Sequence, residues 1–230
     1  MPEHPRLPLV IESAESLAAS LVNPSLLVTL HRDIDKLIGL DGRRLGRSAK
    51  QHALRWAVFT MTYAAVEAFF NDVVGDPSSP RTLPLHPDKL RHAGERHQVK
   101  LFTNDWGVRT RMQGTSGGKR SRWVVFIGKQ SLSAYLSDMK RLRDLLSHGQ
   151  DPRTTSNFSG ALWALANGGN SMRVMGAEGF IQAASDLAAQ TVLAFGGSLD
   201  DVPSWPEPAR SGLSAEPRPE LKLLQGAGRK

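Results

Sequence analysis

Apolar residues recur at intervals of three and four along most of the chain, which is the pattern of amphipathic helices. The chain is broken by short runs of helix-ending residues, such as Asn23-Pro24-Ser25, Gly75 to Pro80, Gly149 and Gly196-Gly197. Between these breaks we predict helices over residues 11–21, 26–40, 47–74, 131–147 and 175–195. This pattern predicts an all-α fold in the form of a helical bundle.

Three stretches depart from the helical pattern. Prolines at positions 2, 5 and 8 predict an extended arm over residues 1–10. Residues 76–129 are expected to form an irregular basic insertion with room for a small β-hairpin, because the run from Trp123 to Ile127 is β-prone. From residue 200 onward, proline and mixed charge predict a disordered tail. One helical domain then spans residues 11–199, with a short helix as an option at Ala161 to Ala166.

The composition limits the function classes. The formal charge is +7 and the sequence pI is about 10.0, which favours polyanionic partners. The absence of cysteine excludes disulfides and thiolate metal sites. No basic-then-apolar leader is found at the start, and no run reaches the roughly 18 apolar residues of a membrane span. We therefore expect a soluble cytoplasmic protein with no membrane contact, no cofactor and no metal.

Much of the charge lies in one segment. Residues 91–129 carry nine basic and two acidic residues, so their net charge equals that of the whole chain. Basic residues interleaved with aromatic ones suit phosphate contact and base stacking. The RNA-binding candidates are Lys119, Arg120, Arg122, Arg109, Arg111 and Trp123. The alternative is a solvated loop that keeps the protein soluble.

The most informative string is Arg143-Asp144-Leu145-Leu146-Ser147-His148, near the end of a predicted helix. A fixed cation, a carboxylate and an imidazole suit cleavage of a phosphodiester without a metal. Asp144 and His148 are four residues apart, so the carboxylate is placed to fix the imidazole tautomer and raise its pKa. Arg143 and His148 point apart by about 140° on an ideal helix. The alternative is an Arg143 that is merely solvated or salt-bridged and a His148 that only favours the helix dipole.

Glu67 is the only charged residue between Trp56 and Phe70. A buried carboxylate needs a partner, and Arg143 is a natural candidate for it. The alternative places Glu67 on the exposed side of its helix, together with Ala64, Ala68 and Asn71.

The Arg-x-x-x-x-His string resembles the signature of the HEPN domain, a helical family rich in RNases. The stretch from Tyr63 to Phe70, with Glu67 inside it, is similar to the acidic, aromatic and alanine-rich helix of that family. The resemblance covers residues 48–197. It implies a dimer in which two copies of the motif share one cleft. Arg143, Asp144 and His148 would be the catalytic residues, supported by Glu67, Tyr63 and Ser147.

The resemblance implies a metal-independent endoribonuclease of the prokaryotic defence or toxin–antitoxin type, with RNA as substrate and an antitoxin protein as a possible partner. His148 would act as general acid or base and Arg143 would stabilise the charge on phosphorus. The main alternative is a non-catalytic HEPN-like module that binds RNA, nucleotide or a partner protein. A third reading is a plain helical interaction protein whose basic segment contacts nucleic acid.

Overall fold

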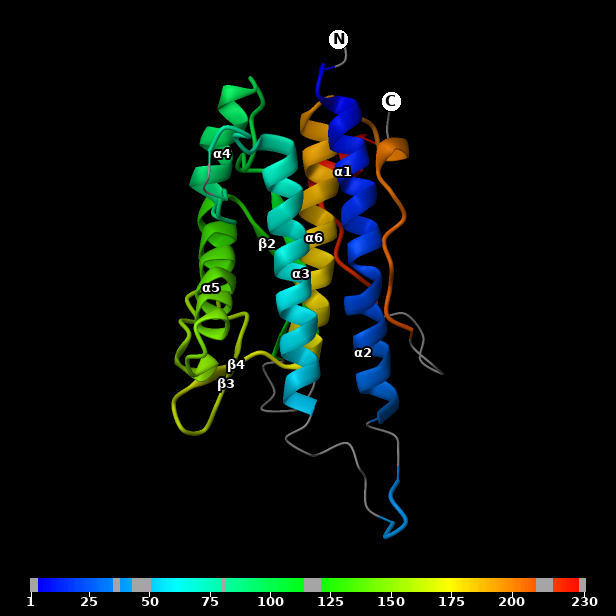
Figure 1. The fold of residues 1–230 in the computed structure, drawn as a ribbon, viewed down its shortest axis with the longest axis vertical. Coiled ribbons are helices and arrows are strands. Elements are labelled where there is room, and N and C mark those ends of the chain that lie inside the picture. The colour runs from blue at the N-terminus through cyan, green and yellow to red at the C-terminus, as the bar shows by residue number, and fades with distance from the viewer. Residues whose placement is uncertain are drawn as a thin grey trace.

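The computed structural model describes residues 4–34, 38–42, 51–79, 82–113, 121–209 and 217–227. Long helices run side by side, with α1 and α2 following one another on one side, α6 and α3 in the middle, and α5 on the other side (Figure 1). The elements are α1 (Leu7–Ser20), α2 (Val22–Ile34), α3 (Gln51–Val74), α4 (Pro87–Arg96), β1 (Gly107–Gln113), β2 (Ser121–Ile127), α5 (Lys129–Ser147), η2 (Pro152–Thr154), β3 (Trp163–Ala164), β4 (Asn170–Ser171), α6 (Val174–Ala194), η3 (Leu199–Asp201) and α7 (Lys222–Ala227). The structure is therefore mainly helical, as predicted, and small antiparallel strand pairs are added to the helices.

Helix α6 lies at the centre of the molecule, and 16 of its 21 residues are buried. Its sequence is rich in glycine and alanine, so neighbouring elements can approach its axis closely. A Cβ atom on Gly176 would lie 2.8 Å from the ring of Trp163. A Cβ atom on Gly179 would lie 2.5 Å from the backbone nitrogen of Arg111 in β1. The small residues of α6 therefore hold β1 directly against the helix.

The strands β1 and β2 form an antiparallel hairpin in which Gly107 lies opposite Ile127 and Gln113 opposite Ser121. The outer edge of β1 is bonded to side chains of α6. The amide of Gln190 accepts a hydrogen bond from the Gly107 nitrogen and donates one to its carbonyl oxygen, at 3.0 and 2.7 Å. The Asp186 carboxylate accepts a hydrogen bond from the Arg109 nitrogen at 2.7 Å. The buried strand edge is therefore satisfied by a helix.

A layer of aromatic side chains fills the space between α5 and the helices α3 and α6. Phe180 of α6 lies 5.1 Å from Phe59, 6.0 Å from Tyr63 and 6.4 Å from Tyr135, measured between ring centroids. The ring of Tyr135 also stacks on Phe126 of β2. Large rings bury much apolar area and pack well in tilted and offset arrangements. These rings connect α5 to α3, α6 and β2.

The structure differs from the predicted arm and the predicted first break. Residues 7–10 belong to α1, and Pro8 lies in its first turn. Asn23 and Pro24 lie in the first turn of α2, which begins at Val22. The physical reason is the same at both places, because proline has no N–H and the first turn of a helix offers that group no partner.

Two further differences lie in segments expected to be irregular. Residues 87–96 of the basic insertion form α4, again with proline at the first helical position. The predicted hairpin is present as β1 and β2, and it includes the β-prone run from Trp123. The optional helix at residues 161–166 is not formed, because Trp163 and Ala164 pair with Ser171 and Asn170 as strands.

None of the described helices is long and apolar enough to cross a membrane.

The sequence predicts a disordered tail after residue 200, whereas the described parts of this segment pack on the bundle. Trp205 packs against the core and Leu221 is buried, while α7 lies against α6. Arg218 donates hydrogen bonds to Gln182 and Glu207, both at 2.7 Å. Isolated apolar residues among prolines lack any helical or strand period, so the pattern did not reveal this contact. The predicted parts at 35–37, 43–50 and 210–216 lie outside the described residues.

We predict that Gly179→Ala lowers the free energy of unfolding by about 1–3 kcal/mol, because the new methyl group meets the β1 backbone, which cannot move aside. Helix propensity alone predicts the opposite sign, a gain of about 1 kcal/mol. Chemical denaturation followed by circular dichroism measures the difference. A more stable variant would contradict the close contact of β1 with α6.

Candidate functional site

The motif residues lie in the last turn of α5 and just beyond it. The helix ends because Gly149 adopts a left-handed conformation, with φ of +64°. The nitrogens of Gly149 and Gln150 then donate to the carbonyl oxygens of Leu146 and Leu145. This closing pattern satisfies the last carbonyl groups of the helix, and it matches the stop predicted at Gly149. His148 is therefore the residue at the helix boundary.

Arg143 joins α5 to α3 through an ion pair with Glu67. Its Nη2 atom lies 2.8 Å from the Glu67 Oε1 atom, and its Nη1 atom lies 3.0 Å from the Asp144 Oδ1 atom. The guanidinium carbon also lies 5.0 Å from the centre of the Tyr63 ring, within the range of a cation–π contact. The ion pair expected between Glu67 and Arg143 is present. Glu67 does lie beside the exposed Ala64 and Ala68, as in the alternative, but its side chain is half-buried and paired with Arg143.

The site is partly shielded from water, since the side chains of Arg143 and Glu67 are 27% and 20% exposed. Burial lowers the pKa of Arg143, but the charge of Glu67 and the neighbouring Tyr63 and Asp144 outweigh it and raise that pKa overall. Burial raises the pKa of the Tyr63 phenol strongly, and Glu67 adds to this effect. No hydrogen bond of good geometry reaches the buried Tyr63 hydroxyl from the described residues.

His148 differs from the expectation in its surroundings. Its side chain is exposed, and among the described residues no hydrogen bond or ion pair to its ring is found. The Asp144 carboxylate binds Lys140 at 2.6 Å and Arg143 at 3.0 Å instead. Two cations on the same helix outcompete the imidazole for this carboxylate. Asp144 therefore does not orient His148 in this structure, and Ser147 is exposed beside it.

Arg143 and His148 are not brought into contact within one chain. Arg143 turns toward α3, and His148 lies on the open surface at the helix end. This agrees with the divergent directions expected on one helix. A cleft that uses both side chains on one phosphate needs either a shift of the helix end or a second motif.

Two of the predicted RNA-binding residues, Arg109 and Arg111, form ion pairs with buried carboxylates of α6. Arg109 binds the buried Asp186 through Nε and Nη2, the shorter distance being 2.6 Å. Arg111 is fully buried and pairs with Glu178 at 3.5 Å, and Glu178 also binds Arg32 at 2.7 Å. Burial raises the pKa of Asp186, and the hydrogen bonds and charge of Arg109 oppose this shift. These arginines stabilise the contact between β1 and α6, so they are not free phosphate ligands.

The other members of that set have different positions. The Trp123 ring makes cation–π contacts with two guanidinium groups, 5.0 Å from that of Arg111 and 5.1 Å from that of Arg218. The ring is therefore already engaged within the fold, which disfavours base stacking. Arg122 is exposed at the start of β2. Lys119 and Arg120 lie outside the described residues.

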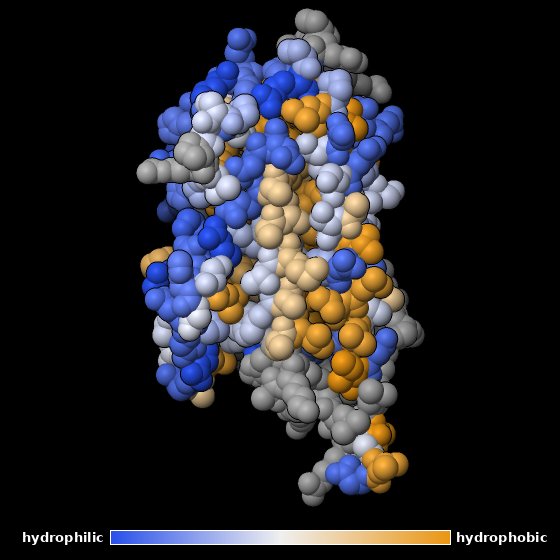
Figure 2. Space-filling view, in the orientation of Figure 1, coloured by the Kyte–Doolittle hydropathy of each residue, from blue (hydrophilic) through white to orange (hydrophobic). Residues whose placement is uncertain are grey.

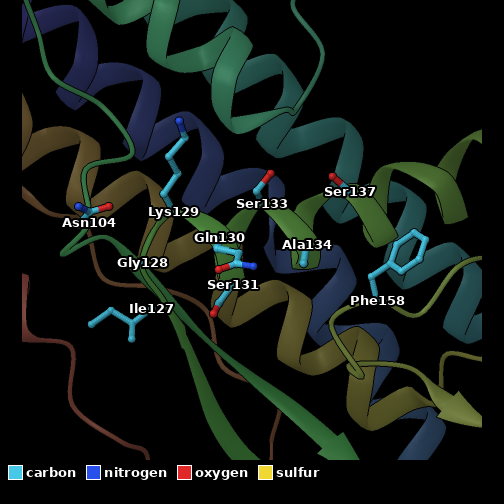
Figure 3. Close-up of a pocket in the computed structure, with 10 residues that line it drawn as sticks. All are labelled: Asn104, Ile127, Gly128, Lys129, Gln130, Ser131, Ser133, Ala134, Ser137 and Phe158. Atoms are coloured by element: carbon cyan, nitrogen blue, oxygen red, sulfur yellow. The ribbon is translucent and has the colours of Figure 1, made fainter.

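A groove that the sequence did not predict runs along the first half of α5, with a volume of about 840 Å³. Asn104 and Ile127 lie at one end and Phe158 at the other (Figure 3). Phe158 is 84% exposed. It is held there by Asp138, a fully buried carboxylate that accepts hydrogen bonds from Ser156, Phe158 and Ser159. In the sequence, the one sign of this arrangement is Asp138 itself, an acidic residue on the apolar side of the helix predicted over residues 131–147.

Comparison with protein families, with curated proteins and with solved structures finds no match to this chain. Within the part of the chain that the structure describes, no three His, Asp or Glu side chains gather in a way that could hold a metal ion. The function proposed below is based on the chemistry of the motif and on its resemblance to the HEPN signature.

The chain has two tyrosines, Tyr63 and Tyr135, and burial raises the pKa of both phenols above the usual value of about 10. We predict that the native protein shows no tyrosinate absorbance at a pH where the urea-unfolded chain has already ionised. Because the folded-state pKa is raised, this contribution to stability is present below about pH 10 and is lost as the pH rises above it. Spectrophotometric titration of native and unfolded protein tests this. Ionisation of either phenol near pH 10 in the folded state would contradict its burial.

Proposed function

We propose that this protein is a metal-independent endoribonuclease whose site contains Arg143 and His148. The observation that carries the proposal is the contrast at the end of α5. Arg143 is fixed by Glu67 and Tyr63, whereas His148, five residues later, is exposed. A fixed cation suits stabilisation of charge on phosphorus, and an accessible imidazole suits proton transfer.

His148 accepts the proton of a ribose 2′-hydroxyl, and the resulting alkoxide attacks the adjacent phosphorus. Arg143 stabilises the negative charge that grows on the phosphorane-like centre. The bond to the 5′-oxygen then breaks, and this oxygen takes up a proton from an imidazolium. The products are a 2′,3′-cyclic phosphate and a 5′-hydroxyl. Single-stranded or looped RNA is the expected substrate, because its backbone can adopt the in-line geometry of this attack.

We further propose that a second copy of the chain completes the cleft, because one chain does not aim Arg143 and His148 at one point. The exposed face of α3 beside Glu67 supports such a contact. This face carries exposed small or apolar side chains at helical spacing, Ala53, Met61, Ala64 and Ala68. Figure 2 shows it as a pale stripe along α3, next to an orange apolar area over α2 that includes Val22, Leu26 and Leu30. Contiguous exposed apolar side chains are typical of surfaces that contact another protein.

The second candidate function is a non-catalytic module that binds RNA, nucleotide or a partner protein such as an antitoxin. The ion pairs of Arg143 favour this candidate. Glu67 and Asp144 already neutralise the Arg143 cation, so less of its charge is left to stabilise a phosphorane-like centre. A module of this kind would bind RNA without cutting it.

We predict that His148→Ala abolishes cleavage of RNA and changes the free energy of unfolding by less than about 0.5 kcal/mol, since the side chain is exposed. Arg143→Ala should abolish cleavage and cost about 1–3 kcal/mol, because Glu67 loses its partner. Cleavage should persist in EDTA.

The matched controls are His92→Ala and Arg141→Ala, which remove exposed side chains outside the site. Undiminished cleavage by pure His148→Ala protein would reject the catalytic assignment, and binding without cleavage by the wild type would favour the second candidate.

We also predict that changing Lys119, Arg120 and Arg122 together to Gln lowers RNA affinity and flattens its dependence on salt, because fewer counterions are released on binding. The single-turnover cleavage rate at saturating RNA should change much less. Arg109→Gln serves as the contrast, since it should lower the free energy of unfolding by leaving Asp186 buried without its partner. Unchanged affinity and salt slope in the triple variant would show that RNA is held elsewhere.

A further inference from the structure

The two edges of the β1–β2 hairpin differ. On β1, the backbone groups of Gly107 and Arg109 point toward α6 and are bonded to Gln190 and Asp186. In an antiparallel pair, successive residues of a strand point their backbone groups to opposite sides. Val108, Thr110 and Met112 therefore make the hydrogen bonds to β2, with Phe126, Val124 and Arg122 opposite them.

It follows that the backbone groups of Trp123, Val125 and Ile127 point away from β1, along the outer edge of β2. Among the described residues, no hydrogen bond to the backbone of these three residues is found. The strand is half-buried to exposed, and Ile127 is 41% exposed. This edge of the hairpin therefore has open backbone donors and acceptors.

Natural proteins protect open strand edges with proline, lysine, inward-pointing charges or bulges. β2 has no proline and no lysine, and its register with β1 is continuous from Gln113–Ser121 to Gly107–Ile127. Its sequence from Trp123 to Ile127 consists of aromatic and β-branched residues, which have the highest strand propensity. An edge of this kind is suited to pairing with another strand.

We propose that β2 pairs in antiparallel fashion with β2 of a second copy of this chain, around a two-fold axis at Val125. The strand is complementary to itself in this register. Val125 lies opposite its own copy, and Trp123 lies opposite Ile127 of the second chain, which covers the exposed isoleucine. The one charge of the strand, Arg122, falls opposite Gly128 of the second chain, outside the pairs that residues 123–127 form. Aromatic and β-branched residues placed opposite one another stabilise such pairs.

This contact is separate from the one proposed for the ribonuclease cleft. β2 leads directly into the start of α5, whereas Arg143 and His148 lie at the C-terminal end of α5. The inference does not depend on catalysis, and its test needs no RNA.

The chain has no cysteine, so single cysteines report individual contacts. Residues directly opposite in a hydrogen-bonded pair have Cα atoms about 5.5 Å apart. This distance lies within the range of about 4.4–6.8 Å that a disulfide spans. We predict that mild oxidation converts Val125→Cys protein into a covalent dimer at least several-fold faster than Leu199→Cys protein. Leu199 is a matched control, because it is a 37% exposed leucine outside the sheet.

A second measurement uses sedimentation of the uncrosslinked protein. Ile127→Lys places a charge on the edge and should weaken self-association through β2 by about tenfold or more, whereas Leu199→Lys should not. Ser147→Cys distinguishes the two interfaces, since it reports contact between the motif ends of α5. Crosslinking of Val125→Cys no faster than the Leu199→Cys control would overturn the inference. If Ser147→Cys protein crosslinks and Val125→Cys protein does not, the pairing of β2 is overturned as well, whereas the proposed contact between the motif ends is supported.

Discussion

The contact between the outer edge of β1 and helix α6 determines how the rest of the structure is arranged. A strand edge that packs on a helix normally loses its hydrogen-bond partners, which is costly in a buried place. Here the Gln190 amide and the Asp186 carboxylate take the place of a neighbouring strand. Because Asp186 is buried, it needs Arg109, and the removal of either residue would leave a charge without a partner. The helix and the strand therefore depend on each other.

This contact also sets the position of the candidate site. β2 pairs with β1 and continues through Gly128 into α5, so a fixed β1 fixes the start of α5. Phe126 and Tyr135 stack between strand and helix, and Asp138 ties the loop after α5 back to the helix. Arg143 and Glu67 then connect α5 to α3 near its far end. The motif thus lies on a helix that is held at several points, which suits a site that needs defined geometry.

Much of the helical architecture could be predicted from periodicity, because helices with one buried face carry that pattern. The predictions for α3, α5 and α6 match the structure closely. The Arg143–Glu67 pair could also be predicted, because a carboxylate in an apolar stretch needs a cation. The partners of Asp186 and Gln190 could not, since these residues bond to a strand 77 and 83 positions away. For the same reason, the sequence predicts Arg109 as an RNA-binding cation, whereas the structure pairs it with Asp186.

Arg109 and Arg111 form ion pairs with Asp186 and Glu178, so they are not available to bind a polyanion. Of the predicted RNA-binding arginines that the structure describes, Arg122 at the start of β2 remains accessible. α5 packs back along β2, as the stacking of Tyr135 on Phe126 and the hydrogen bond between the Tyr135 and Thr110 hydroxyls show. The start of β2 and the end of α5 therefore lie toward the same end of the molecule. A strand of RNA held near Arg122, as proposed above, would lie toward the same end of the molecule as His148, whereas the buried Arg109 and Arg111 stabilise the fold.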